Sequence, residues 1–131
     1  MRVLVVGAGA WGTAVAVHTA AQHATTLWTH RPEQAQAMRG ARVNAAYLPG
    51  VALPPALAMN DSTALAHVAA EHDVVLLATP MAALRAMLQT LANAPVPVVW
   101  LCKGLEDSHD ALLGHEIAQQ VAPTLRGGVL S

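Results

Sequence analysis

Three closely spaced glycines near the start of the chain constrain its fold more than any other feature of the sequence. Gly7, Gly9 and Gly12 lie in the stretch VLVVGAGAWGTA, directly after an apolar run at residues 2–6 and directly before an alanine-rich stretch at residues 10–22. A continuous apolar run without polar alternation is typical of a strand buried on both faces of a parallel sheet. The alanine-rich stretch predicts a helix. The chain therefore opens with a predicted strand, a tight glycine turn and a helix.

The same alternation of strands and helices continues along the chain. Hydrophobic residues make up 54% of the sequence and charged residues 11%, a balance that predicts a folded domain. Further strands are expected at residues 24–29, 56–59, 73–78, 96–102 and from residue 127, and further helices at residues 32–40, 61–70, 80–92 and 107–121. This order predicts an α/β protein with a doubly wound parallel sheet. Residues 1–131 are expected to form one domain.

Capping residues indicate where the helices begin and end. Pro32 suits the first position of a helix, and Gly40 lies where the carboxyl-terminal cap of that helix is expected. Asp61 or Ser62 is expected to cap the next helix with a side-chain oxygen. Residues 44–56 contain three prolines and one glycine, which predict a loop.

Charge, cysteine content and hydropathy argue against several classes of protein. The formal net charge is −1 and the basic residues are scattered, so no basic patch for nucleic acid is visible. No apolar run reaches the roughly 20 residues that cross a bilayer. The single cysteine cannot form an internal disulfide, and pairs such as His67 and His72 lack the spacing of metal ligands, so no metal site is expected.

The expected location is the cytoplasm. Residues 1–16 also resemble a short signal peptide, with one basic residue, an apolar run and small residues. The glycine spacing explains the same residues better.

The spacing Gly7-x-Gly9-x-x-Gly12, between a buried strand and a helix, matches the dinucleotide-binding fingerprint of the Rossmann-type fold. In that motif the first glycine permits a tight turn and the third allows close packing of helix against strand. The second lets the backbone approach a pyrophosphate, which sits on free N–H groups at the positive end of the helix dipole. These residues therefore predict a site for NAD or NADP.

The end of the second predicted strand bears on the choice between the two cofactors. NAD-binding folds carry an acidic residue there, about 20 residues beyond the fingerprint. This chain has Thr29, His30 and Arg31 instead, and its first carboxylate is Glu33. Because Arg31 could pair with a 2′-phosphate, NADP is favoured over NAD. The alternatives are that Arg31 is a solvated residue at a helix start and that His30 is an ordinary loop histidine rather than a neighbour of the adenosine.

Two further residues are candidates for the site. Lys103 follows a predicted strand, and ligands bind beyond the carboxyl ends of strands in such sheets. Its ammonium group could bind a phosphate or polarise a carbonyl oxygen; the alternative is an exposed surface lysine. Trp11, in a variable position of the fingerprint, either covers the cofactor or packs the helix against the sheet.

Several segments together carry a resemblance to a known family. GAGAWGTA, LWTHRPE, RVNAAYLPGVALP, DVVLLATP followed by LR, and KGLE occur in this order over nearly the whole chain. In these segments the chain resembles the bacterial NAD(P)-dependent glycerol-3-phosphate dehydrogenases. The YLPG and KGLE segments are more specific than the glycines, because other dinucleotide-binding folds do not share them.

The resemblance implies a reaction and a set of contacts. The reaction is the interconversion of dihydroxyacetone phosphate and sn-glycerol 3-phosphate, with hydride passing to or from the nicotinamide, in the synthesis of phospholipid precursors. Ala10 and Trp11 would contact the phosphate region of the cofactor, and His30 and Arg31 its adenosine side. Lys103 would contact both nicotinamide and substrate.

The chain also departs from the family pattern. Members of the family continue, after a Ser-Gly-Pro signature, into a helical domain that carries the main catalytic lysine, whereas this chain stops at Ser131. We therefore expect residues 1–131 to be the NAD(P)-binding domain, with no catalytic residue in this chain and little or no turnover by it alone. The terminal GGVLS segment predicts an exposed edge strand, so self-association is expected. Met81 replaces a small polar residue of the family, which leaves that cofactor contact open.

Two other functions fit the fold and the fingerprint. One is another two-domain reductase of hydroxy or keto acids, since the fold alone does not choose a substrate. The other is a non-enzymatic module that senses dinucleotides, although such modules usually keep an acidic residue at the end of the second strand.

Overall fold

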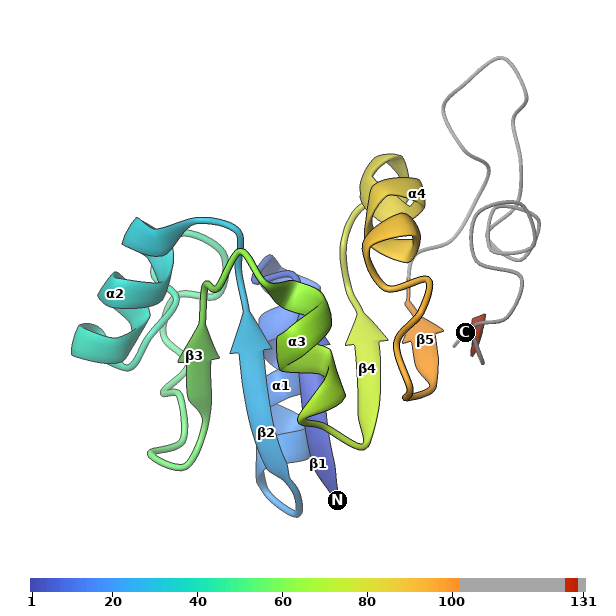
Figure 1. Cartoon of the computed structure of the whole chain (residues 1–131). Coiled ribbons are helices and arrows are strands. Elements are labelled where there is room, and N and C mark those ends of the chain that lie inside the picture. Colours follow the sequence, from blue (N-terminus) through green and yellow to red (C-terminus); the bar gives the residue numbers. More distant parts are fainter. Residues whose placement is uncertain (102–126, 130–131) are drawn as a thin grey trace.

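The computed structural model describes residues 1–101 and 127–129, which form a six-stranded sheet flanked by helices (Figure 1). The strands are β1 (Arg2–Val6), β2 (Ala24–Trp28), β3 (Ala58–Asn60), β4 (Val74–Leu77), β5 (Val98–Trp100) and β6 (Gly127–Val129). In this part of the chain the helices are α1 (Ala10–Ala20), α2 (Pro32–Ala41), α3 (Leu65–Ala70) and α4 (Met81–Thr90). All strand pairs are parallel, in the order β3-β2-β1-β4-β5-β6. The predicted doubly wound parallel sheet is confirmed.

β1 lies in the middle of the sheet and is buried on both faces. It pairs with β2 on one side and β4 on the other, and all its residues except Arg2 are buried. Leu4 and Val6 belong to one apolar cluster, whereas Val3 and Val5 belong to another. Successive side chains of a strand point to opposite faces, so the continuous apolar run supplies both clusters at once.

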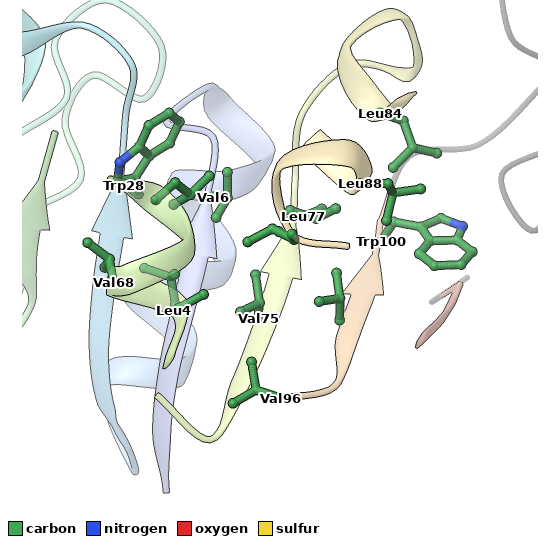
Figure 2. Close-up of a cluster of buried hydrophobic side chains, with 14 residues drawn as sticks. Leu4, Val6, Trp28, Val68, Val75, Leu77, Leu84, Leu88, Val96 and Trp100 are labelled. Carbon is green, nitrogen blue, oxygen red and sulfur yellow. The ribbon is translucent and has the colours of Figure 1, made fainter. Parts of the chain in front are cut away.

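The two clusters hold the helices against the sheet. The first joins Leu4 and Val6 to side chains of α3 and α4, such as Val68 and Leu84 (Figure 2). The second joins the other face of β1 to α1 and α2. Figure 1 shows α3 in front of the sheet and α1 behind it. Leu4 is fully buried, and burial of one such side chain contributes about 1.5–3 kcal/mol relative to exposure. Packing on both faces therefore stabilises β1 in the middle of the sheet.

The end of α2 differs from the prediction. Gly40 lies inside the helix, which continues to Ala41, and Arg42 is the cap residue, with a φ of 53°. A left-handed conformation is costly for a residue with a side chain, so it persists only where other contacts compensate. The Arg42 guanidinium supplies them by donating hydrogen bonds to the carbonyl oxygens of Pro54 and Leu57. The prediction of Gly40 as the cap was wrong because these contacts are tertiary.

The start of α3 also differs from the prediction. The helix begins at Leu65, its cap residue is Ala64, and no side chain caps it. The Ser62 hydroxyl instead accepts a hydrogen bond from the Ala64 N–H (3.1 Å), and the Asn60 side chain accepts one from the Ser62 N–H (2.8 Å). Such local side-chain bonds stabilise turns in place of helix. The expected cap at Asp61 or Ser62 was therefore wrong.

The connecting segments match the prediction where the structure describes them. Residues 44–56 form a loop with an isolated bridge between Asn44 and Leu48. The strand predicted from residue 127 is confirmed as β6, and the helix predicted at residues 107–121 lies outside the described residues. Among residues 1–101 and 127–129, no helix has the length and apolar character needed to cross a membrane.

Candidate functional site

A cavity of about 650 Å³ lies where the strand order changes direction. Residues 7–11 after β1, 28–31 at the end of β2 and 78–81 after β4 line it. In open α/β sheets, ligands bind in the crevice beyond the carboxyl ends of the strands at such a switch point. The cavity is thus the candidate site, and it contains the glycine turn.

Gly7 and Gly12 are required by the fold itself. Gly7 has a φ of 110°, and a Cβ there would lie 3.0 Å from the backbone of Ala78. A Cβ on Gly12 would lie 1.9 Å from the carbonyl oxygen of Gly7. Side chains would therefore push α1 away from β1 and β4, as predicted for the turn and the close packing.

Gly9 is different, because a side chain there would have open space. A Cβ on Gly9 would meet no heavy atom of the described residues within 4 Å, and its φ of −76° is open to any residue. Neither packing nor backbone conformation therefore demands a glycine. Gly9 is also the N-cap of α1, and no side chain caps this helix end. The first N–H groups of a helix have no partner inside the helix, so this end can bind an anion.

Ala10 and Trp11 lie beside Gly9 at the cavity. Trp11 is 63% exposed, and both residues line the cavity. A side chain this exposed does not pack α1 against the sheet, which removes one of the two alternatives for Trp11. The large apolar ring at the rim suits a surface that covers a bound planar group.

The end of β2 brings His30 and Arg31 to the same cavity. Both side chains are exposed and line it. Thr29, just before them, is buried: its hydroxyl donates to the Gln34 side-chain oxygen (2.7 Å) and accepts from the Arg31 N–H (3.2 Å). These bonds fix the turn between β2 and α2. None of the described residues that line the cavity carries a carboxylate.

Three cavity residues were missed by the sequence reasoning. Gln34 and Tyr47 line the cavity, and the fully buried Oγ1 of Thr79 has no hydrogen-bond partner in the described part of the chain. A buried polar atom without a partner costs free energy unless a ligand or water satisfies it. The position of Thr79 directly after β4 is a signal that could have found it. Gln34 and Tyr47 had no such local signal.

Of the remaining sequence candidates, one lines the cavity and one lies outside the described residues. Met81 lines the cavity and packs against the apolar cluster of α3 and α4. Lys103 lies outside the described residues. Within residues 1–101 and 127–129, no group of three His, Cys, Asp or Glu side chains could hold a metal ion.

The geometry therefore fits a dinucleotide. The glycine turn offers free amides and an open approach at Gly9, and the end of β2 offers a cation for the adenosine side. The cavity volume lies in the range of small-molecule sites.

Comparisons with known proteins agree with this assignment. The chain is 50% identical to a glycerol-3-phosphate dehydrogenase [NAD(P)+] of Paracidovorax citrulli and 51% identical to one of Variovorax paradoxus. The matches cover 100% of this chain but 42% and 41% of those relatives, so the chain spans about two fifths of their length. The crystal structure of a glycerol-3-phosphate dehydrogenase from Coxiella burnetii has the same fold, with a TM-score of 0.84 at 23% identity over 98% of this chain and 39% of that one.

The family comparison covers almost every residue and confirms the resemblance seen in the motifs. The family model described as "NAD-dependent glycerol-3-phosphate dehydrogenase N-terminus" matches residues 2–131. The chain therefore belongs to the amino-terminal domain family of the NAD-dependent glycerol-3-phosphate dehydrogenases.

Proposed function

We propose that this chain is the NAD(P)-binding domain of a glycerol-3-phosphate dehydrogenase. The full enzyme would transfer hydride between NAD(P)H and dihydroxyacetone phosphate, giving sn-glycerol 3-phosphate for phospholipid precursors. Family membership supports this function, as does the cavity at the switch point. The observation that carries it is Gly9, where no atom of residues 1–101 or 127–129 accounts for the missing side chain.

The residues of this chain bind and orient the cofactor, which when bound supplies the hydride. The amides around Gly9, Ala10 and Trp11 hold the pyrophosphate at the start of α1, next to Gly7 and Gly12. His30 and Arg31 contact the adenosine side, with the Arg31 guanidinium favouring the 2′-phosphate of NADP. Lys103 is proposed to contact nicotinamide and substrate. No catalytic residue is assigned in this chain.

The domain organisation is part of the same proposal. The relatives extend well beyond the region matched here, and we propose that a helical domain beyond this region supplies the catalytic groups. The small-molecule substrate would bind between the two domains. We also propose a cytoplasmic location and self-association of the 131-residue chain.

Two alanine variants test the proposed site. Gly9→Ala should change the free energy of unfolding by less than about 1 kcal/mol, because the new methyl group meets no protein atom, yet weaken NADPH binding about tenfold or more. Gly12→Ala is the contrasting variant: its Cβ would overlap the Gly7 carbonyl, so it should lower the free energy of unfolding by at least about 2 kcal/mol.

Urea denaturation and calorimetric titration of the 131-residue chain measure both quantities. Tight NADPH binding by a folded Gly9→Ala chain would contradict the proposal, as would a wild-type chain that binds neither NADPH nor NADH.

A further inference from the structure

Asn44 lies 36 positions from Ala8 in the sequence but contacts the glycine turn directly. It is 2% exposed, and its side-chain amide nitrogen donates to the Ala8 carbonyl oxygen (2.9 Å) and to the Thr13 hydroxyl (2.8 Å). Ala8 belongs to the glycine turn and Thr13 to the first turn of α1. One buried amide therefore spans the start of the helix.

The Ala8 carbonyl is held by a second donor. The Gln34 side-chain nitrogen also donates to it (2.9 Å), while the Gln34 side-chain oxygen accepts from Thr29. The carbonyl of Ala8 and the N–H of Gly9 belong to one planar, trans peptide unit, so they point in opposite directions. Fixing the carbonyl toward Asn44 and Gln34 therefore fixes the Gly9 N–H on the other side.

The backbone of Asn44 shapes another part of the cavity wall. Its carbonyl oxygen accepts from the N–H groups of Leu48 (2.8 Å) and Tyr47 (3.3 Å). This turn places Tyr47, which is 45% exposed, on the cavity. Asn44 thus links the glycine turn to the Tyr47 wall through its side chain and its backbone.

We propose that Asn44 is a positioning residue for dinucleotide binding, which orients the Ala8–Gly9 peptide so that the Gly9 N–H serves as a donor to the diphosphate. This inference rests on the proposed function and deepens it. An amide fits this place because one nitrogen with two hydrogens meets two acceptors, the Ala8 carbonyl and the Thr13 hydroxyl. A carboxylate there would face the Ala8 carbonyl with a second acceptor and bring negative charge close to the diphosphate.

The test replaces Asn44 by leucine, which has nearly the same shape but donates no hydrogen bond. In the 131-residue chain, Asn44→Leu should weaken binding of both NADPH and ADP about tenfold, as measured by calorimetry. It should also move the Gly9 amide signal in the 15N NMR spectrum of the ligand-free chain. Thr26→Val is the matched control, since it removes the hydroxyl partner of His72 (3.1 Å) away from the cavity. It should leave both affinities within about twofold.

The possible outcomes separate the two proposals. Unchanged affinities in Asn44→Leu, or equal losses in Thr26→Val, would overturn the role of Asn44 while leaving the proposed function intact. Absence of binding by the wild-type chain would overturn the proposed function and this inference with it. If Asn44→Leu does not fold, Asn44→Asp keeps the size and polarity of the side chain and loses only its donor. The Gly9 amide signal of the ligand-free chain should then shift, and an unchanged signal would overturn the inference.

Discussion

At the residue scale, Thr29 directly follows β2, where dinucleotide-binding folds that prefer NAD carry a carboxylate. Thr29 is 2% exposed, and its hydroxyl proton is already donated to the Gln34 side-chain oxygen (2.7 Å). The next two residues are exposed at the cavity and include the cation Arg31. We therefore propose that cofactor choice at this wall depends on the guanidinium of Arg31.

Replacing Arg31 by alanine tests this dependence. A charge-assisted hydrogen bond contributes about 1.5–3 kcal/mol, so Arg31→Ala should weaken NADPH binding at least about tenfold. NADH has no 2′-phosphate, and its affinity should change less than about twofold. Arg31→Lys keeps the charge without the bidentate geometry and should lie between wild type and alanine for NADPH. Calorimetric titration with each cofactor provides the measurement, and equal losses for both would refute the role of Arg31.

At the element scale, the end of α2 is tied to the segment that leads into β3. Arg42 accepts at its carbonyl a hydrogen bond from the Leu53 N–H (2.7 Å), while its guanidinium donates to Pro54 and Leu57. Pro54 and Leu57 lie outside helices and strands, so no regular ladder satisfies their carbonyls, and the side chain of a neighbouring helix end donates to them. The placement of β3 therefore depends on α2.

The Arg42→Met variant measures that dependence. It removes the charged side-chain donor to the carbonyls of Pro54 and Leu57, of which Pro54 keeps the bond from the Leu57 N–H (3.0 Å), so the free energy of unfolding should fall by about 2–3 kcal/mol in urea denaturation. Arg39→Met is the matched control on the same helix. It loses one hydrogen bond to the Met59 carbonyl (2.9 Å) and a 4.0 Å ion pair with Asp61, which together contribute about 1 kcal/mol. Similar losses in both variants would argue against a special role for Arg42.

At the scale of the whole molecule, the two ends of the sheet differ. At the β3 end, the Arg39 side chain bonds to the Met59 carbonyl and so covers part of the strand. At the other end of the described sheet, β6 is the last strand. It pairs with β5, and Val99 lies opposite Gly128. An uncovered edge strand presents backbone groups that can pair with a second chain.

We therefore expect the 131-residue chain to self-associate through β6. Light scattering during size-exclusion chromatography should give a mass that rises with concentration above the 13.6 kDa of one chain. A charge on an edge strand disfavours such pairing, so Gly128→Lys should lower the mass toward that of the monomer. A chain that stays monomeric at every concentration would contradict this expectation.

Much of the fold followed from local sequence patterns. Apolar runs without alternation predicted β1 and β4, because a strand covered on both faces has no place for polar side chains. The glycine spacing predicted the turn at the cavity, and strand ends predicted that His30 and Arg31 would lie beside it. The apolar runs and the glycine spacing are local in the chain, and the parallel pairing of β1 with β2 brings their carboxyl ends to the same edge of the sheet, so the sequence predicts these features.

The tertiary structure decided the features that depend on long-range contacts. The cap at Arg42 depends on partners 12 and 15 residues away, and the hydrogen bond from Asn44 to Ala8 spans 36 residues. The late start of α3 reflects a competing turn. Local propensity encodes none of these contacts. The glycines show the same division. Their spacing marks a binding turn, but only the distances to surrounding atoms separate Gly7 and Gly12, which packing requires, from Gly9, which it does not. The physical reason is that one missing side chain either makes room for the protein's own backbone or leaves space for a ligand, and only coordinates show which.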